Sequence, residues 1–473
     1  MTTAPALLCF RDDLRLSDNP ALTAAIDSGG PVIAVYVLDE ESAGVRPLGA
    51  AARWWLHQSL SSLRAELAAI GIPLVLRRGA ARQVIVELAV ESGAGAVFWN
   101  RRYGLAERTV DAALKTELRE AGLGAESFAA SLLFEPWTVS TGTGAPYSVF
   151  TPFWRRLLSL PEPRLPLPTP AAMPAADAGA AAGIAGALRG DDLDGWGLQP
   201  SHPDWAGGLR ASWQPGEASA SLLLREFLAD ALPRYETERD LPAEQATSRL
   251  SPALRWGEIS PHTVWHETVR VRNAAAATSG GSSPLASAAT AFLRQLAWRE
   301  FAAHVSFHAP DLGRVNWRPE FDAFEWPPLD RGALSAWQQG RTGVPLVDAG
   351  MRELWTTGTM HNRVRMVVAS YLCKNLLIDW RHGEEWFWQT LVDADAASNP
   401  FNWQWVAGSG ADAAPYFRVF NPLLQQQKFD PHGEYVRSHL PEWGTPAYPD
   451  PLVDLAESRR AALAAYERLR RPS

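Results

Sequence analysis

Short apolar runs alternate with helical stretches over the first third of the chain. Each run is bounded by turn residues, as expected of a buried strand, and the four runs cover residues 6–10, 32–38, 73–76 and 96–99. The stretches between them carry apolar residues every three or four positions, which is the spacing of an amphipathic helix. Because strands that alternate with helices form parallel sheets with right-handed crossovers, residues 1–160 predict an α/β domain with a doubly wound, Rossmann-like parallel sheet.

The turn after the first of these strands lacks the glycines of a dinucleotide-binding loop. It reads Arg11-Asp12-Asp13-Leu14-Arg15, where a dehydrogenase would carry G-x-G-x-x-G so that its backbone can approach a pyrophosphate. This turn argues against a dinucleotide-dependent dehydrogenase.

The composition changes abruptly at residue 161. Proline-rich and then Ala/Gly-rich segments fill residues 161–218, which predicts an interdomain linker that runs over the surface. From residue 219 the strand pattern disappears, and the apolar stretches have helical spacing with Pro, Gly or Asn-Pro at the breaks. Residues 219–473 therefore predict an all-α C-terminal domain.

Charge and cysteine content limit the kinds of partner and site. The 473 residues carry a net charge of −8, so binding of a nucleic acid would need a local positive groove. With only Cys9 and Cys373, the chain cannot form a disulfide framework, a four-cysteine zinc site or a cysteine-ligated iron–sulfur cluster. No apolar run approaches the roughly 18 residues of a membrane span, and the N-terminus does not resemble a signal peptide. We expect a cytoplasmic protein without membrane association.

The segment 246–252 places hydroxyl groups and a guanidinium in a short turn. Thr247, Ser248, Arg249 and Ser251 could bind a diphosphate, because hydroxyls, free backbone N–H groups and Arg all suit phosphate oxygens. The alternative is a plain helix N-cap, with Ser251 immediately before Pro252. Taken alone, the segment favours the cap.

A second candidate lies on the helix expected over residues 287–308. Gln295, Trp298 and Arg299 share a face at i, i+3 and i+4, and an indole beside an amide and a guanidinium can be a platform for a stacked base. The alternative is a buried Trp with a structural pair between Arg299 and Glu300, which is the commoner use of such residues.

Polar residues also gather after residue 361. Arg365 and Asp393 can readily form an ion pair, whereas Asp393 and Asp395, two positions apart, should point in different directions. Neither acid has a His at ligand spacing, so we expect no metal site. Tryptophan is unusually abundant, with 21 residues, although any single buried indole is most often part of the core.

Five ordered motifs resemble the photolyase/cryptochrome family, and the resemblance covers nearly the whole chain. The opening motif is FRDDLR (10–15) with DNPAL (18–22), and the others are TSRLS (247–251), WREF (298–301), MHNR (360–363) and DAAPYFR (412–418), the last continued by FNP (420–422) and KFD (428–430). Together these motifs outweigh the structural alternatives for the single segments. Within the family the chain is most similar to bacterial class I cyclobutane pyrimidine dimer photolyases. The resemblance implies a photo-lyase that binds FAD in its helical domain and repairs UV-damaged DNA.

The resemblance assigns the FAD contacts to residues of the helical domain. The phosphates and the adenosine side would be held by Tyr235, Thr247, Ser248, Arg249, Leu250 and Ser251. The isoalloxazine would be surrounded by Asn362, Arg365, Asp393, Asp395 and Asn399, with Asn399 near the reactive N5. A polar cage with fixed dipoles can stabilise an anionic reduced flavin.

The resemblance also assigns residues to the lesion, to the DNA and to electron supply. The lesion pocket would be lined by Gln295, Trp298, Asn362, Met366 and Trp405. The DNA strand would lie near Arg239, Arg299, Arg363 and Gln425. An indole chain of Trp403, Trp380 and Trp326 would pass electrons from the surface to oxidised flavin, because an indole can be oxidised and an aliphatic core residue cannot.

The first domain would hold a second, antenna chromophore, either a folate or a deazaflavin. Where family members contact folate, the chain reads Tyr103-Gly104-Leu105-Ala106-Glu107. Glu107 matches the folate pattern, whereas Ala106 replaces an Asn. Both chromophores stay open.

Repair of cyclobutane dimers is the favoured activity, and three alternatives stay open. A sensory cryptochrome is disfavoured because Asn399 is typical of photolyases and no long tail follows the last expected helix. A generic electron-transfer flavoprotein would not need the pocket of Trp298 and Met366. A (6-4) photolyase would carry a proton-donating His where this chain has Met366, although Gln295 resembles the (6-4) pattern more than the Glu of cyclobutane enzymes. The resemblance implies a monomer without an obligate protein partner.

Overall fold

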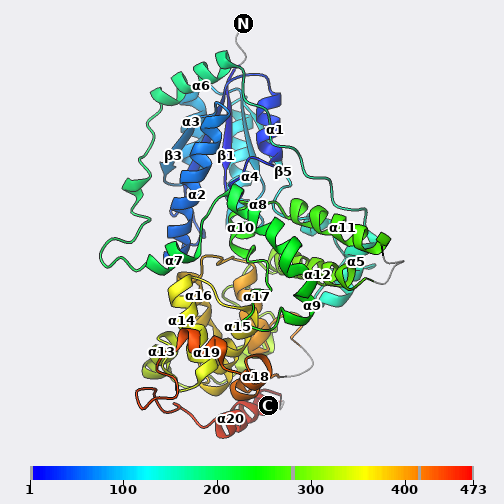
Figure 1. Ribbon diagram of the computed structural model, residues 1–473. Helices are drawn as coiled ribbons and strands as arrows, with labels where there is room; N and C mark the ends of the chain where they lie inside the picture. The colour runs from blue at the N-terminus through cyan, green and yellow to red at the C-terminus, as the bar shows by residue number, and fades with distance from the viewer. Residues whose placement is uncertain (1–3, 279–282, 414–416, 471–473) are drawn as a thin grey trace.

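A computed structural model describes residues 4–278, 283–413 and 417–470. Figure 1 shows a sheet flanked by helices in the N-terminal part of the chain and, below it, a lobe built of helices. Within the described residues, no strand follows residue 128. The expected fold class, a parallel-sheet α/β domain followed by a helical domain, is confirmed.

Five parallel strands form the sheet in the order β3–β2–β1–β4–β5. They span Ala6–Phe10 (β1), Val32–Leu38 (β2), Leu74–Arg78 (β3), Ala96–Asn100 (β4) and Gly124–Phe128 (β5). Every residue of β1 and β2 is buried, because a parallel sheet is covered by helices on both faces. The chain order reverses between β1 and β4, so the loop after β1 leaves the sheet at its topological switch point.

The sequence patterns did not predict β5. It is an edge strand that pairs only with β4, in the register Val97 opposite Ala125. Its sequence, Gly-Ala-Glu-Ser-Phe, has a single fully buried residue, Ala125. An edge strand is half solvated, so it lacks the continuous apolar run by which the inner strands are found.

Helices flank the sheet on both sides, and one of them lies in the expected linker. The flanking helices are α1 (Pro20–Asp27), α2 (Ala50–Ala69), α3 (Ala81–Ser92), α4 (Leu105–Glu120) and α6 (Ala175–Ala187). The α6 helix forms in the Ala/Gly-rich part of residues 161–218 because alanine has the highest helix propensity. Its Ala181 is completely buried in the core of the sheet domain, so this part of the segment is packed structure.

The remaining helices form the lower lobe and its connections. They are α5 (Phe150–Ser159), α7 (Gly207–Ser212), α8 (Glu217–Glu226), α9 (Tyr235–Glu238), α10 (Ser251–Trp256), α11 (Pro261–Thr278), α12 (Pro284–His308), α13 (Arg331–Gln338), α14 (Pro345–Thr357), α15 (Asn362–Ser370), α16 (Trp380–Thr390), α17 (Ser398–Ala407), α18 (Pro422–Phe429), α19 (Glu434–His439) and α20 (Leu455–Arg470). Although α5 precedes the linker in sequence, it packs on α12 through Phe150 and Phe153.

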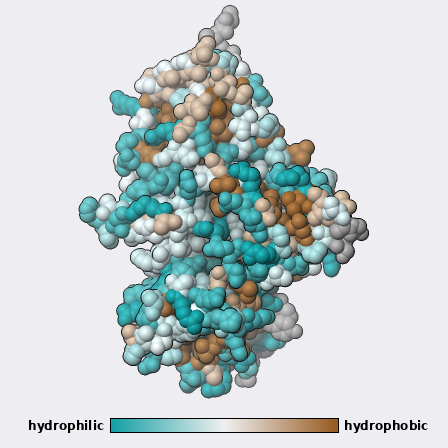
Figure 2. Space-filling model, in the orientation of Figure 1, coloured by the Kyte–Doolittle hydropathy of each residue, from teal (hydrophilic) through white to brown (hydrophobic). Residues whose placement is uncertain are grey.

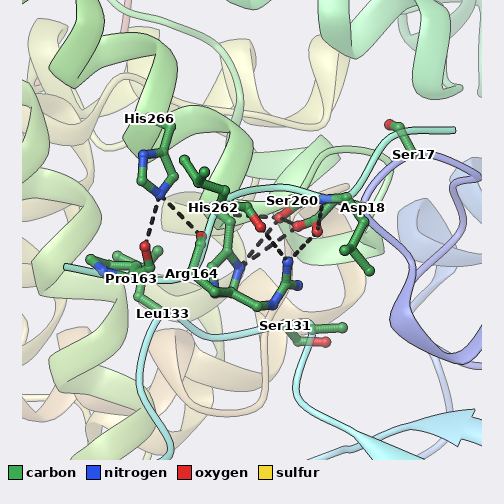
Figure 3. Close-up of polar contacts among 12 residues, drawn as sticks. Ser17, Asp18, Ser131, Leu133, Pro163, Arg164, Ser260, His262 and His266 are labelled. Atoms are coloured by element: carbon green, nitrogen blue, oxygen red, sulfur yellow. Dashed lines mark hydrogen bonds and ion pairs between the residues drawn. The ribbon is translucent and has the colours of Figure 1, made fainter. Parts of the chain in front are cut away.

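A buried polar junction joins the loop after β1 to the helical lobe. Arg15 is completely buried and donates to the carbonyl oxygens of Gly257 (2.9 Å), Asp18 (2.9 Å) and Ala130 (3.1 Å). The carboxylate of Asp18 accepts hydrogen bonds from Arg164 and Ser260, as Figure 3 shows. The opening motif therefore joins the sheet domain to residues within and after the expected linker.

Gly257 lies at the tightest point of this junction. A Cβ atom there would lie 2.2 Å from the carbonyl oxygen of Asp12 and 2.5 Å from the Cα atom of Asp13. Its φ of +67° is also in the left-handed region that favours glycine. The close contact and the left-handed φ each favour glycine at this position.

The face shown in Figure 2 is mainly hydrophilic, with hydrophobic atoms gathered chiefly in the region of α11. No described helix is both long and apolar enough to cross a membrane. Among the described residues, no group of three or more His, Cys, Asp or Glu side chains could hold a metal ion.

We expect Gly257→Ala to lower the free energy of unfolding by about 2–4 kcal/mol, because left-handed strain adds to a clash with a neighbouring backbone. Gly29→Ala is the matched control, since Gly29 has φ +74° and no atom within 4 Å of the place that a Cβ atom would occupy. Gly29→Ala should lower the free energy of unfolding only by the backbone strain, about 1–2 kcal/mol. Chemical denaturation of both variants measures the difference, and equal losses would show that the contact with Asp12 is unimportant.

Candidate active site

Arg365 and Asp393 form the ion pair that the sequence suggested. Nη2 of Arg365 lies 3.0 Å and 3.2 Å from the two carboxylate oxygens of Asp393, and its Nε donates to the carbonyl of Met360 at 2.7 Å. The Asp393 side chain is 5% exposed and that of Arg365 is 25% exposed. The carboxylate is therefore sequestered, while part of the Arg365 side chain stays exposed.

The neighbouring acid, Asp395, has a different partner. Its Oδ1 accepts from the backbone N–H groups of Ala397 (3.0 Å) and Ser398 (2.6 Å), where α17 begins. The two acids thus engage different partners, as their spacing predicts. Asp393 pairs with Arg365 of α15, and Asp395 binds the backbone where α17, the helix that carries Asn399, begins.

Asn399 is held by Glu384 of α16, a residue that the sequence analysis missed. The amide nitrogen Nδ2 of Asn399 donates to the carbonyl oxygen of Glu384 at 3.0 Å and to its Oε1 at 2.8 Å. The sequence did contain a signal that Glu384 faces the core. It follows Trp380 by four positions, so this acid shares a helix face with a buried indole.

The segment 247–251 leads into α10. Ser251 is the first residue of the helix, and Leu250 occupies the N-cap position without a side-chain capping bond, so the N-cap interpretation of Ser251 is wrong. Thr247 and Ser251 are exposed, whereas Leu250 is buried. Among the described residues, neither hydroxyl has a hydrogen-bond partner, so both are available to a ligand.

The other two members of this segment have protein partners. Ser248 accepts a hydrogen bond from the N–H of Leu250 at 3.4 Å. Arg249 has a left-handed φ of +53°, donates to the carbonyl of Ser212 at 2.9 Å and lies 4.4 Å from the ring centre of Trp213. Arg249 is thus held by Ser212 and Trp213 in the same short segment as the two free hydroxyls.

The end of α10 brings this segment next to the acids. Arg255 donates to the carbonyl of Ala394 at 2.7 Å, and the indole N–H of Trp256 donates to the carbonyl of Val392 at 3.0 Å. Both carbonyls flank Asp393. The two groups of residues expected to bind FAD therefore belong to one region of the lobe.

The chemistry of this region fits FAD. Accessible hydroxyls and guanidiniums suit phosphate oxygens, and the polar set of Arg365, Asp393 and Asn399 suits the polar edge of a flavin ring. Asn362 is exposed at the start of α15. Tyr235 is buried among aromatic rings, with the guanidinium of Arg239 5.5 Å from its ring centre.

Trp298 is a braced platform on α12. Phe150 of α5 is stacked on it, with ring centres 3.7 Å apart and planes at 8°, and Phe401 of α17 lies 6.3 Å away. Gln295, one turn earlier, is partly exposed. The packing therefore combines both interpretations of this segment: the indole belongs to a core cluster and still keeps a partly exposed surface.

Arg299 donates to two backbone carbonyls, those of Ser131 (2.8 Å) and Leu254 (3.3 Å). It lies 3.5 Å from Glu300, whose carboxylate also accepts from the N–H of Leu133 at 2.8 Å. Burial raises the pKa of Glu300 to about 7. In this structure the guanidinium tethers three segments, and its contact with DNA stays a prediction.

The other expected DNA contacts lie together. Arg363 pairs with Asp240 at 2.9 Å, which places it beside Arg239, and its Nη1 lies 4.0 Å from the sulfur of Met366. Its guanidinium is also 4.4 Å from the ring centre of Phe429 in α18, the helix that carries Gln425. Arg363 of α15 thus contacts both the segment 239–240 and α18.

His361 joins the segment around Arg239 to the start of α15. Its Nε2 lies 3.0 Å from the carbonyl of Arg239, and its Nδ1 accepts from the N–H of Arg363 at 3.2 Å. Burial lowers the pKa of His361 to about 4, so the ring is neutral at pH 7 and donates through Nε2 alone. The histidine therefore joins α9 to α15 without adding charge to the site.

The three indoles of the expected electron chain lie in or against one core cluster. Trp380 and Trp403 are 1% and 2% exposed, and Trp326 packs against the same cluster. The ring of Trp403 lies so close to Gly383 of α16 that a Cβ atom there would be 2.1 Å from it. The N–H of Trp380 donates to Asn316 at 3.0 Å, whereas the buried N–H of Trp403 has no partner among the described residues.

Trp405 points to another neighbour, Arg418, whose guanidinium lies 5.3 Å from its ring centre. Because Trp403 and Trp405 are two positions apart on α17, they lie on different faces of that helix. The family motif before Arg418 includes residues 414–416, which lie outside the described residues.

Two further features lie near the expected antenna region. Tyr103, Trp137 and Phe307 form an aromatic group, with Arg108 4.0 Å from the ring centre of Phe307. A separate cavity of about 390 Å³ lies beside the junction of Figure 3. Its walls include Leu132, Leu133, Phe134, Pro161, Arg164 and His262.

Comparison with known proteins identifies the family. The family model described as DNA photolyase matches residues 6–173, and the model described as FAD binding domain of DNA photolyase matches residues 292–445. The chain is 48% identical to the protein named deoxyribodipyrimidine photo-lyase of Agrobacterium fabrum, over 98% of both chains. It is also 36% identical to Cryptochrome-1 of Arabidopsis thaliana, over 96% of this chain and 69% of that protein.

Solved structures agree on the fold and do not support the expected subclass. The crystal structure of a bacterial class III photolyase from Agrobacterium tumefaciens matches with a TM-score of 0.90 and 46% identity, over 99% of this chain and 98% of that one. An archaeal photolyase from Sulfolobus tokodaii, solved with two FAD molecules, matches with a TM-score of 0.79 and 28% identity, over 98% of this chain and 100% of that one. The class III neighbour does not support the expected class I assignment. The chain belongs to the DNA photolyase/cryptochrome family, and its helical lobe contains that family's FAD-binding domain.

Proposed function

We propose that this protein is a light-dependent DNA repair enzyme that splits cyclobutane pyrimidine dimers, a deoxyribodipyrimidine photo-lyase. The observation that carries the proposal is the contact between α12 and α17. Trp298, expected in the lesion pocket, lies 6.3 Å from Phe401, which follows Asn399 by two positions. A base stacked beside Trp298 would thus lie near the residues that hold the flavin.

The protein's own residues would bind the cofactor and set its electrostatic environment. When bound, FAD supplies the light-driven donation of one electron to the dimer and takes it back after the dimer has opened. Arg365 would offer its accessible guanidinium edge to the ring while Asp393 fixes its position. Thr247, Arg249 and Ser251 would hold the phosphates.

The lesion pocket would favour cyclobutane dimers. Opening a cyclobutane ring needs an electron and no strong acid, and Met366 offers only a soft thioether. A (6-4) lesion needs a proton that Met366 cannot give. Gln295 can donate two hydrogen bonds to the carbonyl groups of the lesion.

DNA would be held by local positive charge. The net charge of −8 does not prevent binding, because guanidiniums such as Arg239 and Arg363 can contact the phosphates directly. A damaged pair stacks poorly, so it costs less to flip it out of the duplex. We further propose a cytoplasmic monomer with domains over residues 1–160 and 219–473, joined by 161–218, and a folate or deazaflavin as antenna.

A sensory cryptochrome is the second candidate, because the chain matches Cryptochrome-1 of Arabidopsis thaliana at 36% identity. It shares the fold and the cofactor but would signal instead of repairing DNA. The decisive assay is purification under yellow light, a flavin spectrum, and blue-light repair of duplexes that carry either a cyclobutane dimer or a (6-4) product. Cyclobutane repair supports our proposal, whereas a flavin-containing protein that repairs neither lesion would favour the cryptochrome.

We expect Trp403→Phe to abolish photoreduction of oxidised FAD and to leave repair intact once the flavin has been reduced chemically. The indole would supply electrons to the flavin and would not touch the lesion. Flavin absorbance under blue light measures the first effect and dimer repair the second. Trp99→Phe, at a buried indole of the sheet, is the matched control. Photoreduction equal to wild type would show that another donor dominates.

We expect Gln295→Glu to preserve or raise repair of cyclobutane dimers, because a carboxyl group at this position resembles the usual family residue. The quantum yield of repair, measured with a dimer-containing oligonucleotide, tests this expectation. Repair of (6-4) DNA without repair of cyclobutane dimers in the wild type would show that Gln295 is a better guide to specificity than Met366.

A further inference from the structure

A buried carboxylate stands between Asn399 and a cation from the sheet domain. Glu384 of α16 has a side chain that is only 4% exposed. On one side its Oε1 accepts from Asn399 at 2.8 Å. On the other side its two oxygens accept from the two terminal nitrogens of Arg46, at 2.8 Å and 3.0 Å. Arg46 lies in the loop between β2 and α2.

This geometry fixes the orientation of the Asn399 amide. Both groups within reach of one end of the amide, the backbone carbonyl and the carboxylate of Glu384, can only accept hydrogen bonds. The NH₂ group must therefore face Glu384, and both of its hydrogens are used there. The carbonyl oxygen Oδ1 points away from Glu384 and is the group that Asn399 can offer to another partner.

The loop that carries Arg46 is firmly docked on α16. The guanidinium lies 4.1 Å from the ring centre of Trp388, and the N–H of that indole donates to the carbonyl of Pro47 at 2.9 Å. At Gly49 the fit is so close that a Cβ atom would lie 1.9 Å from the carbonyl oxygen of Trp388. Arg46 is thus held in place independently of its ion pair with Glu384.

We propose that Arg46 is a positioning residue for the flavin site, acting through Glu384 on Asn399; this inference rests on the proposed function. A carboxylate that is nearly excluded from water needs a counter-ion, and Arg46 supplies it through two hydrogen bonds. With its charge balanced, Glu384 stays beside Asn399 and holds the amide with Oδ1 outward. The sheet domain therefore contributes, through Glu384, to the site in the helical lobe.

The orientation has a chemical consequence for the cofactor. The family resemblance implies that Asn399 lies near the reactive N5 of the flavin. At that position an outward-facing acceptor would favour a nitrogen that carries a hydrogen over one that carries a lone pair. Oδ1 of Asn399 therefore favours the reduced over the oxidised flavin. Loss of the Arg46 ion pair should weaken this preference, because the uncompensated carboxylate leaves its place beside the amide.

The test is a redox titration of the flavin in purified holoprotein for wild type, Arg46→Met, Glu384→Gln and the double variant. We expect Arg46→Met to lower the equilibrium constant for two-electron reduction about tenfold, which is about 30 mV. In the Glu384→Gln background the same change should have little effect, since no charge is left to balance. Glu385→Gln is the matched control, because Glu385 also contacts Arg46, at 2.6 Å, but has no contact with Asn399.

An unchanged potential in Arg46→Met, or an equal shift in Glu385→Gln, would overturn the inference. Arg46→Lys keeps the charge with fewer hydrogen bonds and should fall between wild type and Arg46→Met, which also provides the test if Arg46→Met does not fold. Thermal unfolding of each holoprotein separates a shift in potential from a loss of docking. A wild type without bound flavin or without dimer repair would count against the proposed function instead.

Discussion

One completely buried guanidinium, that of Arg15, joins three segments at the junction between the sheet domain and the helical lobe. Arg15 donates to carbonyl oxygens that belong to the loop after β1, the segment after β5 and the turn after α10. A buried charge is costly unless its donors are satisfied, so these three segments must converge on it. The turn at Gly257 is thereby fixed against the sheet domain, and with it α10, whose last residues hold the backbone on either side of Asp393.

The residues of α17 that are expected to act on the flavin and on the lesion lie on different faces of that helix. Asn399 and Trp403 are one turn apart and both face α16, through Glu384 and Gly383. Phe401 lies on another face of α17, where it meets Trp298 of α12. In the proposed enzyme, electron supply and control of the flavin would lie on the first face and the lesion pocket on the second.

The buried tryptophans differ in whether their N–H groups have a partner. Trp256 and Trp337 are fully buried, and each donates its N–H to a backbone carbonyl, as a core indole should. Trp403 is equally buried, yet its N–H has no partner among the described residues. In the proposed enzyme, an oxidised Trp403 without a base beside it would keep its proton, which would suit an indole that passes on an electron and is then restored.

The sequence by itself determined the fold class, the inner strands and the family, because each depends on local periodicity or on short ordered motifs. It also suggested the pairing of Arg365 with Asp393, which the structure then showed. It did not reveal β5, since an edge strand has no continuous apolar run, or α6, since the alanine-rich segment resembled a linker. Only the tertiary structure placed Arg46 against Glu384, 338 positions later in the chain, and Glu384 against Asn399. The physical reason is that a buried carboxylate takes its counter-ion from whichever segment packs beside it, and no sequence period encodes that choice.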